Sequence, residues 1–95
     1  MEDQNTIYEL MKEYRINVAG MDEPVYGKIW KIMGEDNYTR FCYDFSHFFL
    51  PGENADYSDE RITRESYDQV EIIVLQYLRD FTTEYGEPKK NSFFK

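Results

Sequence analysis

The spacing of apolar residues near the start of the chain is that of a helix. Between positions 6 and 14 they recur at i, i+3, i+4 and i+7, as Ile7, Leu10, Met11 and Tyr14. Thr6 and Glu9 have the spacing of a capping box, which satisfies amide groups at a helix N-terminus. We therefore expect a short helix over residues 6–14, and because short helices are marginal in water, we expect it to pack against the rest of the chain.

An alternating pattern follows this segment. Ile16 and Val18 alternate with polar or smaller residues, which favours a short edge strand over residues 15–21. Gly20 interrupts the alternation, and the Asp-Glu-Pro run at residues 22–24 predicts a turn.

The segment from Val25 to Leu50 holds the only tryptophan, cysteine and histidine of the chain, and we expect it to form a β-hairpin. Residues 25–33 are rich in strand-forming types, residues 34–37 form the turn, and residues 38–49 form the partner strand. If Met33 lies opposite Tyr38, then Trp30 lies opposite Phe41, and Tyr26 lies opposite Phe45.

This register assigns each side chain of the hairpin to one of two faces. The face expected to lie inward carries Tyr26, Lys28, Trp30, Ile32, Phe41, Tyr43 and Phe45. The face expected to be partly wet carries Val25, Ile29, Lys31, Met33, Tyr38, Arg40, Cys42, Asp44 and Ser46. A slip of one residue would exchange the two roles.

A second, longer helix is expected after an acidic loop at residues 51–64. It begins between residues 63 and 66 and ends near Thr83, with Ser66 and Gln69 as its capping box. Its apolar arc consists of Val70, Ile73, Val74, Tyr77, Leu78 and Phe81.

Two apolar residues of this helix, Ile72 and Leu75, fall among its polar positions. Either a terminal segment or another molecule covers them, or they are ordinary exposed residues. The tail after Pro88 either folds back over them with Phe93 and Phe94 or is a flexible end.

Together these elements predict one α+β domain spanning residues 1–95, with flexible tails at 1–5 and 88–95. We expect a small two-layer fold in the order α-β-β-β-α. A three-stranded antiparallel sheet is covered by the long C-terminal helix and the short N-terminal one.

The charge balance narrows the possible partners. Nineteen acidic residues against eleven basic ones give a formal net charge of −8, which disfavours direct binding of nucleic acid. One cysteine excludes an internal disulfide, no apolar run is long enough to span a membrane, and the N-terminus has no signal-peptide pattern. We therefore expect a cytoplasmic protein that does not bind membranes.

Candidate chemistry is sparse. Cys42 and His47 are five residues apart on one strand and so point to opposite faces, which excludes a Cys–His pair within it. Asn54, Asp56, Ser58 and Glu65 have the spacing of a calcium loop, but Asp59 stands where glycine is required. We expect no enzyme activity, no cofactor and no metal site.

The leading functional hypothesis is therefore an acidic protein-binding module. Its most specific form is an inhibitor or immunity-type protein that occludes a basic site on a nucleic-acid-handling partner, with DNA mimicry as one way to do so. The expected binding residues are Glu53, Asp56, Asp59, Glu60, Glu65, Asp68, Glu71, Ile72 and Leu75. The alternatives are a homo-oligomeric structural or regulatory module joined through Ile72 and Leu75, and a small enzyme or ligand-binding domain around His47.

Overall fold

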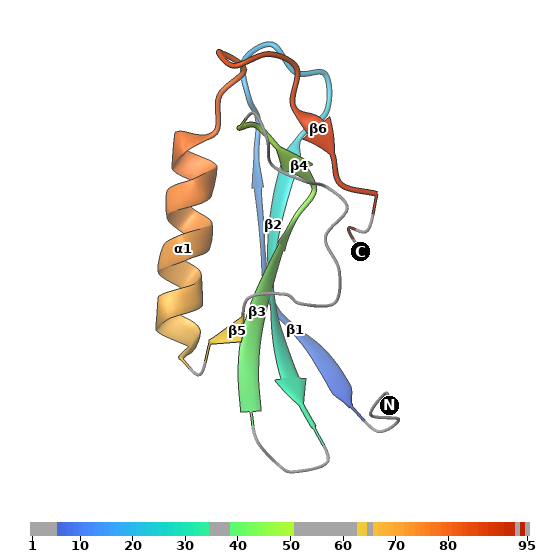
Figure 1. Cartoon of the computed structure of the whole chain (residues 1–95), viewed down its shortest axis with the longest axis vertical. Helices are drawn as coiled ribbons and strands as arrows, with labels where there is room; N and C mark the ends of the chain where they lie inside the picture. The colour runs from blue at the N-terminus through green and yellow to red at the C-terminus, as the bar shows by residue number, and fades with distance from the viewer. Residues whose placement is uncertain (1–5, 35–38, 51–62, 65, 93, 95) are drawn as a thin grey trace.

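The computed structural model describes residues 6–34, 39–50, 63–64, 66–92 and 94. Its elements are β1 (Ile7–Ile16), β2 (Val25–Met33), β3 (Thr39–Phe45), β4 (His47–Phe48), β5 (Thr63–Arg64), α1 (Tyr67–Asp80) and β6 (Lys89–Lys90). Strands β1, β2 and β3 form an antiparallel sheet that β5 extends, in the order β1-β2-β3-β5, and β4 pairs with β6. Helix α1 runs alongside β3 and β2 (Figure 1). The α+β class is confirmed.

The predicted helix over residues 6–14 is wrong, because this segment is most of strand β1. It pairs with β2 from Ile7 opposite Met33 to Ile16 opposite Val25. The register shifts between Leu10 and Lys12, so that β1 contains a β-bulge there. The extra residue breaks the strict alternation of a strand, and it leaves the apolar residues at a spacing that resembles a helical turn.

The short strand expected over residues 15–21 is also wrong as an element of its own. Its first residues complete β1, and residues 17–24 connect β1 to β2. Gly20 has a φ of 90° in this connection, a conformation that residues with a Cβ rarely adopt.

Strand β2 has the predicted bounds. The partner strand predicted over residues 38–49 is divided into β3 and β4, with residue 38 outside the described residues, and the register of β2 and β3 differs from the prediction by one residue. Gly27, and not Tyr26, lies opposite Phe45, and Met33 lies opposite Thr39. Val25 and Ile29 are therefore the fully buried residues of β2 that contribute to the main core. The inward face was predicted correctly for β3 and wrongly for β2.

Gly27 explains why the inward face of β2 was misjudged. It lies between Val25 and Ile29 and adds no apolar side chain to their face. The hydrophobic pattern of that face is therefore interrupted in the sequence. In the structure a Cβ at this position would lie 3.0 Å from Val74 Cγ1 and 3.2 Å from Leu78 Cδ1. The missing side chain therefore lets α1 approach the sheet closely.

Helix α1 follows its predicted pattern closely. The Ser66 hydroxyl accepts a hydrogen bond from the backbone N–H of Gln69, as the capping box predicts. The helix ends at Asp80, before the predicted Thr83, with Phe81 as its C-cap. Its buried residues are packed with side chains from β2, β3 and β4, and this core consists of Val25, Ile29, Phe45, Phe48, Phe49, Val70, Val74, Leu78 and Phe81. No helix in the described part of the chain is long and apolar enough to cross a membrane.

The described part of the C-terminal segment contacts the sheet and not the outer side of α1. Asn91 is buried, and its side-chain amide donates to Phe45 O at 2.8 Å and to Asp44 Oδ1 at 3.2 Å. The Phe94 ring stacks against the Tyr26 ring with centroids 6.3 Å apart. Phe94 therefore covers Tyr26 and not Ile72 or Leu75 as one alternative proposed, whereas Phe93 lies outside the described residues.

Candidate functional site

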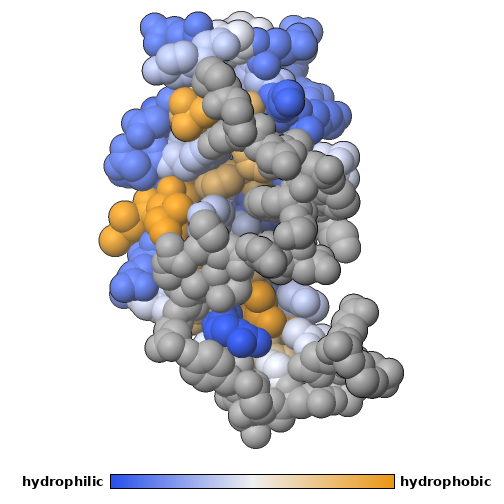
Figure 2. Space-filling view, in the orientation of Figure 1, coloured by the Kyte–Doolittle hydropathy of each residue, from blue (hydrophilic) through white to orange (hydrophobic). Residues whose placement is uncertain are grey.

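The residues predicted to bind a partner fall into two groups, those outside the described residues and those on α1. Glu53, Asp56, Asp59, Glu60 and Glu65 lie outside the described residues, as does the calcium-like pattern that begins at Asn54. Asp68 is exposed in the first turn of α1, Ile72 is 66% exposed, and Leu75 is half-buried. Figure 2 shows hydrophobic side chains at the surface over α1, on the left of the view.

Most of the excess acidic charge is carried by residues that lie outside the described part of the chain. Nine of the nineteen acidic residues lie there, but only two of the eleven basic ones do. The acidic residues concerned are Glu2, Asp3, Glu35, Asp36, Glu53, Asp56, Asp59, Glu60 and Glu65. The described surface is therefore close to electrically balanced, and its geometry adds nothing to the hypothesis of a carboxylate row.

Glu71, one of the predicted binding residues, is engaged inside the protein. Its Oε2 atom accepts a hydrogen bond from the Tyr14 hydroxyl at 2.8 Å and another from the Tyr67 hydroxyl at 3.2 Å. Burial and the hydrogen bond to Glu71 raise the pKa of Tyr14 to about 12. Glu71 therefore connects α1 to β1, and a partner would have to compete with two tyrosines for it.

The raised pKa of Tyr14 predicts a loss of stability at alkaline pH. A tyrosine with a higher pKa in the folded state contributes stability that is complete below the unfolded pKa of 10.0 and lost as pH rises to about 12. Urea unfolding between pH 8 and pH 12 should show the wild type losing stability relative to Tyr14→Phe across this window. Parallel pH profiles for the two proteins would contradict the assigned hydrogen bond.

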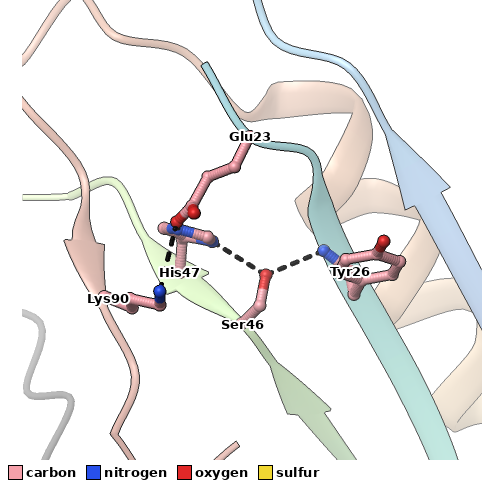
Figure 3. A network of polar contacts seen from close by, with 5 residues as sticks. All are labelled: Glu23, Tyr26, Ser46, His47 and Lys90. Atoms are coloured by element: carbon pink, nitrogen blue, oxygen red, sulfur yellow. Dashed lines mark hydrogen bonds and ion pairs between the residues drawn. The ribbon is translucent and has the colours of Figure 1, made fainter. Parts of the chain in front are cut away.

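His47 lies at the centre of a polar network at the other end of the sheet (Figure 3). Its Nε2 atom lies 2.8 Å from Glu23 Oε1, and its Nδ1 atom lies 2.8 Å from Ser46 Oγ. Lys90 Nζ lies 3.6 Å from the same Glu23 oxygen. The hydrogen bond from His47, and then the charge of Lys90, lower the pKa of Glu23. We call these four residues the His47 network.

The order Ser-His-Glu is that of a catalytic triad, but the geometry does not suit nucleophilic catalysis. Ser46 Oγ accepts a hydrogen bond from the Tyr26 backbone N–H at 2.8 Å, and Ser46 is only 6% exposed. A buried hydroxyl occupied in this way does not reach a substrate. The network instead joins three segments: the connection before β2, the start of β4, and β6.

The side chain of His47 makes two polar contacts, to Ser46 and to Glu23. Glu23 was missed because it is 24 residues away in the chain and belongs to a turn. Only the pairing of β4 with β6, and the path of the preceding connection, bring Lys90 and Glu23 to it.

Strand β1 presents a cluster of exposed apolar side chains that the sequence pattern missed. Their exposed fractions are 57% for Ile7, 58% for Tyr8, 42% for Leu10 and 40% for Met11. We call these four residues the β1 surface. β1 is the edge strand of its sheet, and no described strand pairs with the edge that faces away from β2. The N-terminal half of β1 also extends beyond the end of α1 (Figure 1).

Among the described strands, one edge of β1 is thus left unpaired, and large apolar side chains lie along the same strand. Strand edges that no other strand covers pair readily with other chains. The signal was present in the sequence as Ile7-Tyr8, two residues of strand-forming types, but the helical spacing outweighed it.

Comparisons with protein-family models, with curated proteins and with solved structures find no match for this chain.

Proposed function

We propose that this chain is a protein-binding module and that β1 is the strand that binds the partner. The observation that carries this proposal is the β1 surface, where four large apolar residues are 40–58% exposed on an edge strand. A partner strand added to such an edge gains main-chain hydrogen bonds, and its side chains gain apolar contact. Both contributions are available without any rearrangement of α1 or of the His47 network.

Capture of the partner from a lysate of the native source should depend on β1. We expect the double variant Tyr8→Arg, Leu10→Arg to lose the captured protein, since charge replaces apolar contact at two exposed positions. Ile72→Arg is the matched control, because Ile72 is as exposed but lies on α1, and it should retain the partner. Loss of capture in Ile72→Arg alone would move the binding surface to the helix.

The more specific hypothesis, an inhibitor or immunity-type protein that occludes a basic site and mimics DNA, remains a proposal. It is supported by the net charge of −8, although Glu71 is engaged by two tyrosines. Running the same capture at low and high salt tests it, because binding between opposite charges weakens as salt rises. We also propose a cytoplasmic location, which the single cysteine and the absence of a signal-peptide pattern in the sequence support.

A second candidate function is ligand binding beside His47. The residues that line an open pocket there include His47, Asp22, Glu23, Glu87, Lys89 and Lys90, and of its carboxylates Glu23 contacts the histidine. Its weakness is that His47 Nε2 already contacts Glu23, and the side chain of His47 is only 6% exposed. A ligand would reach the ring only if Glu23 moved, and we therefore prefer the β1 surface.

A further inference from the structure

We propose that the strand bound by β1 is β1 of a second copy of this chain, running antiparallel, with Glu9 of each copy opposite Lys12 of the other. The inference rests on the proposed function in one respect, that β1 binds a protein strand. It goes further by naming the partner and the register.

The bulge in β1 decides which of its residues share a face. Through their partners on β2, Ile7, Glu9, Lys12 and Tyr14 lie on the side of α1. Two contacts agree with this: the Tyr14 hydroxyl donates to Glu71 of α1, and Lys12 Nζ lies 5.8 Å from the centroid of the Tyr14 ring.

The other face of β1 is set in the same way. Tyr8, Leu10, Glu13 and Arg15 lie opposite Ile32, Trp30, Lys28 and Tyr26 of β2. These β2 residues belong to the sheet face that the C-terminal segment contacts through Phe94. Apolar residues of the β1 surface therefore occur on both faces of the strand, and a strand paired with β1 could gain apolar contact on each face.

Side chains opposite each other in an antiparallel pair lie on the same face, which restricts how β1 can pair with itself. Pairing Ile7 with Tyr14 satisfies this rule along the strand. It puts Glu9 opposite Lys12, and because of the two-fold symmetry it does so twice. Leu10 and Met11 meet at the two-fold axis.

A second register also places side chains of the same face opposite each other, and it pairs Ile7 with Ile16. It puts Glu9 opposite Tyr14 and Leu10 opposite Glu13, so no opposite charges face each other, and one carboxylate lies against an apolar side chain. Opposite charges in directly opposed positions stabilise a strand pair. The register that pairs Ile7 with Tyr14 is therefore favoured, because it places Glu9 opposite Lys12.

The bulge supports a second copy as the occupant. Each β1 contributes one extra residue at the same place, so two copies paired about the Leu10–Met11 axis are equal in length, and no residue is left over. The two-fold axis is perpendicular to the sheet, so the two sheets become continuous and both α1 helices lie on the same side.

Sedimentation equilibrium of the full chain tests this proposal at concentrations up to about 1 mM. We expect a monomer–dimer equilibrium. Lys12→Glu alone, or Glu9→Lys alone, puts like charges opposite each other twice and should weaken the dimer by about ten-fold or more. The double variant Glu9→Lys, Lys12→Glu restores opposite charges and should recover the wild-type dimer constant.

Circular dichroism checks that each variant is folded, and Ile72→Glu is the control on the outer side of α1. It should leave the dimer unchanged. A chain that stays monomeric at every concentration overturns this inference, whereas the proposed function is decided separately by the capture experiment with Tyr8→Arg, Leu10→Arg. A dimer that the single charge changes do not weaken, or that the double variant does not restore, also overturns it.

Discussion

Replacing Phe45 by alanine should lower the free energy of unfolding by about 3–5 kcal/mol. Phe45 is 3% exposed, and its ring stacks on the Tyr77 ring with centroids 4.0 Å apart. Truncation removes this contact and leaves a cavity between β3 and α1 that surrounding side chains fill only in part. Urea unfolding at neutral pH, followed by circular dichroism, measures the difference.

Ile72→Ala is the matched control for this prediction. Ile72 is a large apolar residue that is 66% exposed, so its truncation should change the free energy of unfolding by less than about 0.5 kcal/mol. Equal effects of the two substitutions would mean that Phe45 does not lie in the core, and the pairing of β2 with β3 would then have to be revised.

Gly27→Val should lower the free energy of unfolding by about 1–3 kcal/mol, the usual cost of overpacking a core. Even the Cβ of a new side chain would meet Val74 Cγ1 at 3.0 Å, Leu78 Cδ1 at 3.2 Å and Phe45 Cε1 at 3.3 Å. Valine suits strands better than glycine by a fraction of this amount, so the steric cost decides the sign. The same urea unfolding measurement applies.

Lys31→Val is the control, since it introduces the same side chain on the same strand and the same face at a half-buried position. We expect a change within about 1 kcal/mol. This pair also tests the register. If Tyr26 lay opposite Phe45, as the sequence pattern suggested, Gly27 would lie on the wet face, and Gly27→Val would be neutral or stabilising.

The parts of the fold that could be predicted are those set by local chemistry. The N-cap at Ser66, the buried stripe of Val70, Val74 and Leu78, and the bounds of β2 follow from capping and periodicity. Each depends on residues within one or two turns of each other, which is the range over which such patterns are informative.

Strand β1 could not be predicted, because its bulge makes a strand imitate the spacing of a helix. Residues 7–13 are all exposed, so burial did not impose a regular alternation on them either. The register of the hairpin failed for a related reason: Gly27 contributes nothing to a hydrophobic pattern, although it determines how closely α1 approaches.

The contacts of the candidate sites depend on residues far apart in the chain. Tyr14 and Glu71 are 57 residues apart, and their hydrogen bond forms only because α1 packs on the face of the sheet to which Tyr14 belongs. The exposure of Ile72 was anticipated as one alternative, since its position on the helix is a local property. The β1 surface could not be predicted from the sequence, because its prediction required that β1 first be identified as a strand.

The most direct test of the account is an isotope-filtered NOE experiment on a mixture of labelled and unlabelled chains, which detects only contacts between copies. The proposed dimer predicts intermolecular NOEs between residue 9 of one copy and residue 12 of the other, and between Leu10 and Met11. Intermolecular NOEs from Ile72 and Leu75 instead, or none at a concentration where the chain is dimeric, would contradict it.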